Sequence, residues 1–459
     1  MKASRRSTYR QARAIPALRF EDQSLTSFAG LVVFQQFFAN IKLAARFANC
    51  FGHLKSKKVF GLQKVFLQLV VHLILGFREL RDSQHYEDDP LVKRILGLNT
   101  LPDVATISRT LKDAGEESIS RLRSLLRQMV IERLVQYSEV VRITLDFDGS
   151  VFSTGRYAEG TAVGFNKKKK GARSYYPLFC MVAQLGQVFD FLHRPGNVHD
   201  SKDAEAFILA CIQQIRAALP WVVIEVRMDS AFFSDAIIQA LEAANVEFTI
   251  SVPFERFVQL KQKVEQRKAW SCLNGEVSYF ESKWKPKSWN RRCRFLFIRT
   301  LSKKQQKGPV QLDLFVPHEY GYEFKVIVTN KQVQANAVVV FHEGRGSQEG
   351  IFAELKTDCH LDYVPARRLI SNQLYLLAGL FAHNLTRQLQ METAPPSRRT
   401  TPKRTALWVF QKLETIRHTV IQRAGRLTRP HGTLTLTIGG GEMLKHRLQT
   451  LLRGLQVSC

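Results

Sequence analysis

Three charged residues are spaced so that they could act together on a phosphate group. The segment FHEGRGSQEGIFAELKTD, residues 341–358, contains Arg345, then Glu349 four residues later, then Lys356 seven residues beyond that. In a continuous helix of 3.6 residues per turn, these side chains fall within about 40° of one another on one face. Glu354 is turned roughly 140° away from Glu349. The three charges are either a solvated row or one wall of an active site in which a carboxylate binds metal beside neutralised phosphates.

Glycines weaken the first turn of this expected helix. Gly344, Gly346 and Gly350 all lie in the segment, and glycine loses more conformational freedom in a helix than any other residue. A second interpretation therefore starts the helix later, with Ser347 as its N-cap. Arg345 then precedes the helix, and the three charges no longer share one continuous face.

Two aspartates end expected β-strands. Asp148 closes ITLDFDGS, two residues after Asp146 on the same strand face, and Asp229 closes VVIEVRMDS. Together with Glu349, these aspartates could hold two Mg²⁺ ions about 3.5 to 4 Å apart for an in-line phosphoryl displacement. Each also has a structural interpretation, because Asp before Gly is a frequent turn residue and Asp-Ser at a strand end is a common helix N-cap. Asp146 is either a further metal ligand or a structural carboxylate.

The charge balance of the chain points to a polyanionic partner. Its 67 Lys and Arg outnumber its 40 Asp and Glu, for a net charge of +27 in 459 residues. Neutralising phosphates releases condensed counterions, so such an excess favours binding to nucleic acid. Double-stranded DNA is the partner that we expect.

Other classes of protein are not favoured by the sequence. No apolar run reaches the 18 residues that suggest a membrane span, since the run from Val65 to Phe77 is shorter and is interrupted by His72. The N-terminus is basic but lacks the apolar stretch of a signal peptide, which predicts a cytoplasmic protein without membrane association. The seven Cys form no CxxC pair, which argues against a zinc site.

Changes of pattern divide the chain into four regions. Residues 1–22 form a basic arm, and residues 23–138 have the three- and four-residue apolar spacing of a helical domain. Residues 139–394 predict a mixed α/β sheet, with three meandering strands followed by helix, strand, helix and strand. A β-rich insertion interrupts this domain at about 255–320, and a basic region follows at 395–459.

A lysine-rich connection lies between the first two expected strands. It reads NKKKKGARSYY and combines cations with two aromatic residues. It is either a phosphate clamp next to Asp148 or a solvated loop. The candidate DNA contacts in it are Lys167, Lys168, Lys169, Lys170 and Arg173.

A short helix in the N-terminal region is a second candidate DNA contact. The stretch NTLPDVATISRTLKDAG predicts a turn and then a helix that starts near Asp103 or Ala105 and exposes Thr106, Ser108 and Arg109. A helix-turn-helix places such an element in the major groove, although a capped surface helix has the same pattern. In the insertion, Trp270, Trp284 and Trp289 are either base-stacking residues or core residues.

In this order, the segments resemble those of a DDE insertion-sequence transposase. The branch concerned has a ribonuclease-H-like catalytic domain and the signature Tyr-x₂-Arg-x₃-Glu-x₆-Lys, of which Arg345, Glu349 and Lys356 match the last three members. DFDGS and VRMDSAFFS are similar to its first and second Asp strands. SYYPL, LHRPGNVHDSKDA and LPDVATISRTL are also similar to segments of this branch. In one departure, the signature Tyr falls on His342, with Phe341 one place early.

The resemblance implies a transposase that binds the terminal inverted repeats of its mobile element, cuts there and joins the 3′ ends to target DNA. Asp148, Asp229 and Glu349 would hold two Mg²⁺ ions, for which Mn²⁺ can substitute. Arg345 and Lys356 would contact the flanking phosphates, as would His342 less reliably at neutral pH.

Assembly and location follow from the same resemblance. The helical region would bind DNA, and the pairing of two element ends implies a homodimer on DNA. We expect a bacterial, nucleoid-associated protein. The alternatives are a non-catalytic DNA-binding protein that retains the fold, and a nuclease that cuts without joining.

Overall fold

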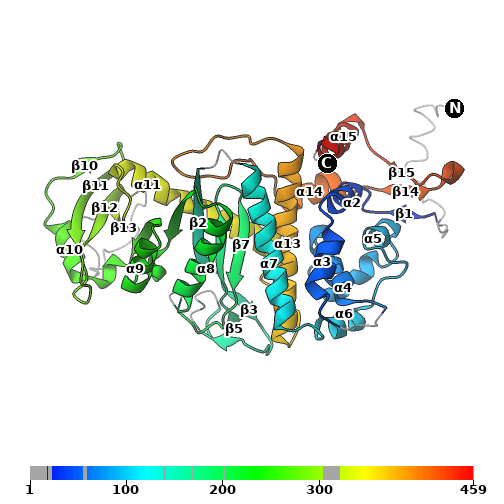
Figure 1. The fold of residues 1–459 in the computed structure, drawn as a ribbon, viewed down its shortest axis with the longest axis horizontal. Helices are drawn as coiled ribbons and strands as arrows, with labels where there is room; N and C mark the ends of the chain where they lie inside the picture. Colours follow the sequence, from blue (N-terminus) through cyan, green and yellow to red (C-terminus); the bar gives the residue numbers. More distant parts are fainter. Residues whose placement is uncertain are drawn as a thin grey trace.

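A helical N-terminal part lies beside a large β-sheet, and the insertion strands lie at the far end of that sheet (Figure 1). Almost all of the predicted basic arm at 1–22 lies outside the described residues, as do Lys167 and Lys168. The computed structural model describes residues 18, 23–54, 59–137, 141–164, 166, 169–199, 202–302 and 321–457.

The sheet has nine strands in the order β10-β11-β12-β13-β9-β8-β2-β6-β7. The first three of its strands along the chain form an antiparallel meander, in which β2 pairs with β6 and β6 with β7. β8 then pairs in parallel with β2, and β9 in parallel with β8. This mixed α/β sheet confirms the predicted succession of strands. The strands are β2 (Arg142–Gly149), β6 (Leu178–Val182), β7 (Gln187–Leu192), β8 (Val223–Met228) and β9 (Glu247–Val252).

Strand alternation gives the sheet two different apolar faces. In β6, Leu178, Cys180 and Val182 join the core formed with α8 (Ala204–Ala218) and α9 (Asp235–Ala243). The intervening Phe179 and Met181 join a second core, which contains α13 (Leu369–Thr393) and the N-terminal helices. The helical region and the sheet therefore share one continuous core.

The insertion extends the same sheet. β12 pairs with β13, and β13 pairs with β9, so the insertion strands continue the central sheet at one edge. Trp284 and Trp289 are buried there as core residues, and Trp270 is half-buried with the Arg299 guanidinium 4.6 Å from its ring centroid. The insertion elements are α10 (Val258–Glu265), β10 (Ser271–Cys272), β11 (Val277–Trp284) and β12 (Cys293–Leu301), and the strand that follows the insertion is β13 (Tyr322–Thr329).

The C-terminal region packs against the helical region. A two-residue strand, β1, pairs with β14, and β14 pairs with β15, although the sequence predicts no strand in the helical region. None of the helices in the described ranges is long and apolar enough to span a bilayer. The elements are β1 (Leu25–Thr26), α2 (Leu31–Asn40), α3 (Leu43–Phe51), α4 (Leu62–Leu75), α5 (Pro90–Ile95), α6 (Val104–Leu111), α7 (Glu116–Gln136), β14 (Gly425–Thr428), β15 (Thr435–Ile438) and α15 (Glu442–Val457).

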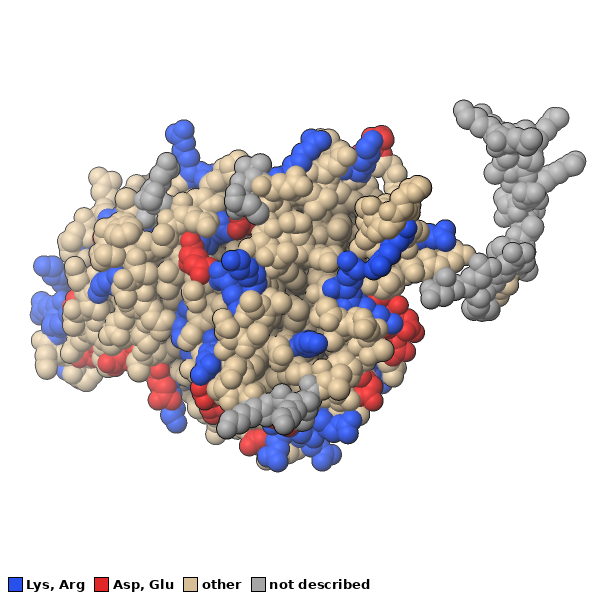
Figure 2. Space-filling view, turned by 45° about the vertical axis from the view of Figure 1, so that its right-hand side comes forward, with Lys and Arg blue, Asp and Glu red and all other residues tan. Residues whose placement is uncertain are grey.

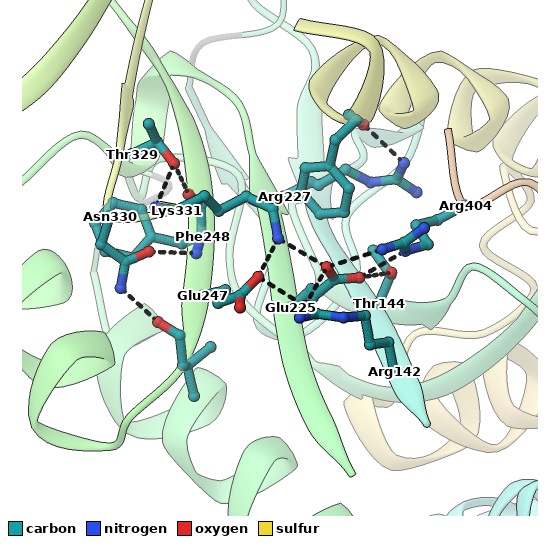
Figure 3. A network of polar contacts seen from close by, with 12 residues as sticks. Arg142, Thr144, Glu225, Arg227, Glu247, Phe248, Thr329, Asn330, Lys331 and Arg404 are labelled. Carbon is teal, nitrogen blue, oxygen red and sulfur yellow. Dashed lines mark hydrogen bonds and ion pairs between the residues drawn. The ribbon is translucent and has the colours of Figure 1, made fainter. Parts of the chain in front are cut away.

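A buried ionic network ties the beginnings of the parallel strands to the C-terminal region (Figure 3). The Glu225 carboxylate accepts hydrogen bonds from Arg404 at 2.8 Å, Lys331 at 2.7 Å and Arg142 at 3.0 Å. Burial alone raises the pKa of this carboxyl, but Arg404 and Lys331 outweigh it and lower the pKa from 4.5 to about 2. The network therefore depends on an ionised Glu225.

We expect Glu225→Gln to destabilise the protein at neutral pH and to matter less in acid. Because the folded pKa lies below the unfolded one, the stabilisation is complete above pH 4.5 and is lost as the pH falls towards 2. The shift corresponds to something on the order of 3 kcal/mol. Urea unfolding of both proteins at pH 7 and pH 3 measures this, and an equal difference at both pH values would contradict it.

Candidate active site

Asp148 and Asp229 lie at the same end of two neighbouring parallel strands. Phe147 of β2 is in register with Met228 of β8, so the two aspartates are the next pair in that register. Neighbouring strands lie about 4.8 Å apart, and paired residues point to the same face of the sheet. The fold thus brings together two carboxylates that are 81 positions apart in the chain.

Each aspartate also makes the local hydrogen bond that its structural interpretation predicts. The Gly149 amide donates to Oδ1 of Asp148 at 2.8 Å, and the Ala231 amide donates to Oδ1 of Asp229 at 3.0 Å. Asp229 caps a short 3₁₀ helix, Ser230–Phe232. A carboxylate has about four lone-pair sites, so a turn bond and a metal ligand role are compatible.

The predicted helix at 341–358 is broken at its glycines. It consists of α11 (Ala335–Glu343), a 3₁₀ turn at Gly344–Gly346 and α12 (Ser347–Thr357). Ser347 is the first residue of α12 and donates to the Gly344 carbonyl at 2.9 Å, so it is not the N-cap. Arg345 lies in the turn, where its guanidinium is 3.5 Å from Oδ2 of Asp148.

The two glutamates of α12 have different environments. Glu349 is exposed in the first turn, whereas Glu354 is buried and forms an ion pair with Arg387 of α13. Burial raises the pKa of Glu354, and its carboxylate also accepts from the Leu413 amide at 3.3 Å. Glu354 therefore holds α12 against its neighbours, away from the strand ends.

A cavity of about 510 Å³ opens at the residues that directly follow Asp148. Lys356 lines it and lies two helical turns from Glu349, on the same face of α12. Three cations border the cavity, one of them from the N-terminal helical region. The lining consists of Arg78, Gly149, Ser150, Val151, Ser153, Asn166, Lys169, Tyr176, Lys356 and Asp362.

The other predicted basic contacts have mixed positions. Lys169 lines the cavity and Lys170 is exposed beside it in the sequence. Arg173 donates to Oγ1 of Thr161 at 3.0 Å and lies over the ring of Tyr157, so its guanidinium is used within the protein. Arg109 is exposed on α6, as predicted, and Asp103 caps this helix.

His342 lies in the core and not on the surface. Its ring is 1% exposed, with Nδ1 2.9 Å from Oγ1 of Thr249 and Nε2 2.9 Å from Oγ of Ser251. Burial, more than the nearby cations, lowers the pKa of this imidazole well below 6.5, so the ring is neutral at pH 7. Both ring nitrogens of His342 are therefore already engaged by hydroxyl groups inside the protein.

Sequence reasoning missed the contribution of Arg78. This residue follows α4, donates to Asp362 at 3.3 Å and lies 5.2 Å from the ring centroid of Tyr363. Only the fold brings it to the strand ends, because it lies 70 positions before Asp148 in the chain. Its one signal in the sequence is a cation that directly follows the apolar run ending at Phe77.

The carboxylates match Mg²⁺ chemically, since hard cations prefer oxygen ligands. Asp148 and Asp229 supply such oxygens from adjacent strand ends, and α12 carries Glu349 on the same helical face as Lys356, which lines the cavity. Within the described ranges, however, no three His, Cys, Asp or Glu side chains are grouped closely enough to hold a metal ion. The donor types fit the ion, but the three carboxylates are not yet gathered around one point.

The sequence of the whole chain can be compared with those of known protein families. The sequence matches the family described as "Transposase DDE domain group 1" over residues 10–458. The chain belongs to this transposase DDE domain family. The family covers the sheet, the helical region and the C-terminal region alike, so all three are parts of one family unit. No curated protein matches this DDE-family chain.

Solved structures with some likeness to this DDE-family chain are also transposases. A piggyBac transposase synaptic complex with hairpin DNA is 10% identical, with a TM-score of 0.40 over 78% of this chain and 74% of that one. A Mos1 transposase paired-end complex with left transposon end is 14% identical, with a TM-score of 0.17 over 43% and 60%. A Mos1 mariner paired-end complex with Mn is 12% identical, with a TM-score of 0.17 over 53% and 70%.

Proposed function

We propose that this protein is a DNA transposase that binds the terminal inverted repeats of an insertion sequence, cuts at the element ends and joins them to target DNA. The observation that carries the proposal is the register pair Asp148 and Asp229 at adjacent strand ends, beside Arg345 and a cavity lined with cations. Membership in a transposase DDE family supports the same reaction class. We further propose that the sheet is a ribonuclease-H-like catalytic domain, as its three-strand meander and two added parallel strands suggest.

Asp148, Asp229 and Glu349 are the proposed ligands of two Mg²⁺ ions, with Mn²⁺ as a substitute. Bound divalent ions would activate water or a 3′-hydroxyl and stabilise the leaving oxygen. For all three carboxylates to act together, Glu349 has to approach the strand ends. Arg345 neutralises Asp148 before this happens and is then available for a phosphate.

The cavity is the proposed path of the cleaved strand. Lys169, Lys356 and Arg78 approach it from three separate elements, which lets them contact successive phosphates. Lys167, Lys168 and Lys170 of the same connection, and Arg109 of α6, are further proposed contacts. His342 and Arg173 are left out, because the core and Thr161 already use their polar atoms.

The charge of the whole chain is consistent with extended DNA contacts. Figure 2 shows Lys and Arg at several separate places on one face, with Asp and Glu between them. Such a distribution suits two DNA segments, an element end and a target, better than one continuous groove. We propose that a homodimer holds the two ends and that the protein acts in the bacterial nucleoid.

An assay with an element end and a target duplex tests this function. With Mg²⁺ present, we expect nicks at the end and covalent joining of the 3′ end to the target. Nicks without joined products would indicate a nuclease. Binding without nicks would indicate a DNA-binding protein that retains the fold.

We expect Arg78→Ala to weaken binding to end DNA and to reduce its salt dependence. Each lost phosphate contact lowers the slope of log K against log salt by about 0.9 on duplex DNA. This slope is measured by DNA-binding titrations at salt concentrations between about 50 and 200 mM. Lys287→Ala, at an exposed lysine of the insertion, is the matched control. An unchanged slope in Arg78→Ala would remove this residue from the interface.

A further inference from the structure

A second pair of charged residues lies directly behind the proposed catalytic aspartates. Asp146 of β2 and Arg227 of β8 are register partners, each two residues before Asp148 or Asp229. Strand alternation places all four on the same face of the sheet. Asp146 and Arg227 are 2% and 0% exposed, so this pair is buried under the site.

Arg227 links the two aspartate strands to the end of α11 and to the C-terminal segment. Its Nε and one terminal nitrogen donate to the two Asp146 oxygens at 2.6 and 2.7 Å. Its other terminal nitrogen donates to the carbonyl of Phe341 in α11 at 3.0 Å and to the carbonyl of Lys403 at 2.7 Å. One guanidinium thus joins β2, β8, the end of α11 and the C-terminal segment.

The turn that carries Arg345 rests on this guanidinium. A Cβ atom at Gly344 would overlap both the Lys403 carbonyl oxygen and an Arg227 terminal nitrogen. Gly344 has an ordinary helical φ of −57°, so the space and not the backbone conformation calls for glycine here. The turn can therefore approach Arg227 only without a side chain at this position.

This pair is better explained by geometry than by stability. Burying two charges is expensive, and replacing a buried ion pair by apolar residues is often neutral or stabilising. A bidentate Arg-carboxylate pair does, however, fix two groups at a defined distance and angle. The parallel strands receive that constraint two positions before Asp148 and Asp229.

We propose that Arg227 is a positioning residue for the DNA-cutting centre. Through Asp146 it fixes the spacing between Asp148 and Asp229, and through Phe341 and Gly344 it holds Arg345 beside them. This proposal rests on the proposed function, because it assigns that centre to the two aspartates.

The Arg227→Lys variant separates positioning from stability. Lysine keeps the charge but is a point donor without the planar fork. We expect cleavage to fall by about 10²-fold, as displacements near 1 Å can cause, and Mn²⁺ affinity, measured by electron paramagnetic resonance with uncleaved end DNA, to fall as well. The affinity for end DNA should not change.

Arg404→Lys is the matched control, because Arg404 pairs with Glu225 in the ionic network at the other end of the strands. We expect it to lower the unfolding midpoint while Mn²⁺ affinity and cleavage stay near those of the unchanged protein. If Arg227→Lys behaves in the same way as this control, Arg227 has only a structural role. Asp146→Asn, which preserves the shape of the carboxyl, replaces Arg227→Lys in the comparison should that variant not fold.

Failure of the proposed function gives a different result. The unchanged protein would then not cut DNA, and Asp229→Ala would bind Mn²⁺ with the same affinity as the unchanged protein. If the unchanged protein cuts and Asp229→Ala does not, a normal rate and normal Mn²⁺ affinity in Arg227→Lys overturn the positioning role alone.

We expect Gly344→Ala to reduce cleavage strongly and Gly346→Ala to be tolerated. The two glycines flank Arg345, but a Cβ at Gly346 has no neighbouring atom within 4 Å. Single-turnover cleavage at a temperature where both variants are folded gives the comparison. Equal rates for the two would show that the turn does not rest on Arg227 in solution.

Discussion

Asp229→Ala is expected to abolish DNA cleavage and to leave binding of end DNA nearly unchanged. Asp229 lies at the end of β8, in register with Asp148 on β2. In the proposed two-metal centre, losing one of three carboxylates would remove charge stabilisation of several kcal/mol, and about 4 kcal/mol corresponds to 10³-fold in rate. Single-turnover cleavage of a labelled duplex in Mg²⁺ measures the loss.

The stability of Asp229→Ala separates this effect from misfolding. Asp229 caps a 3₁₀ helix of three residues, so its loss costs about 1 kcal/mol, as at other N-caps. Glu205→Gln, at an exposed carboxylate of α8, is the control for a change of charge. Cleavage at the unchanged rate in Asp229→Ala would place the reaction elsewhere in the protein.

Glu349→Gln and Glu354→Gln are expected to have opposite effects. Glu349→Gln should stop cleavage because Glu349 is the proposed third metal ligand. It should leave the unfolding midpoint almost unaltered because Glu349 is exposed in the first turn of α12. Glu354 is buried against Arg387, and breaking such a pair leaves an uncompensated charge at a cost of about 3 kcal/mol or more. Glu354→Gln should therefore lower the unfolding midpoint.

The two glutamine variants are compared in one experiment. Thermal unfolding and cleavage are measured for both, and cleavage is scored at a temperature where Glu354→Gln remains folded. If Glu354→Gln loses cleavage while it is folded, and Glu349→Gln retains it, the third carboxylate has been assigned to the wrong residue of α12.

The strands and the two aspartates could be predicted because their information is local. In RITLDFDG the buried Ile143, Leu145 and Phe147 alternate with Thr144 and Asp146, which is the period of a strand. The positions of Asp148 and Asp229 at strand ends follow directly from that period. The turn between β6 and β7, at residues 183–186, is likewise predicted by the break between two such runs.

Other features depend on contacts between segments that are distant in the chain. The periodicity of one segment gives no information about such contacts. Of the two interpretations of 341–358, the later helix start is observed, since Arg345 lies in a turn before α12, but the packing of this turn on Arg227 and Lys403 could not be predicted. His342 matches a signature position by spacing, yet Thr249 and Ser251 of another strand hold it in the core. The contribution of Arg78 to the cavity has the same origin, since only the tertiary fold brings it there.

The central claim is that this chain joins DNA ends at the centre formed by Asp148 and Asp229. Its most direct test is to sequence the junctions made from an element end and a target duplex in Mg²⁺, with the unchanged protein and with Asp229→Ala. With the unchanged protein, we predict junctions in which the 3′-terminal nucleotide of the element is joined to target DNA. With Asp229→Ala, we predict none. Equal numbers of such junctions with both proteins would contradict the claim.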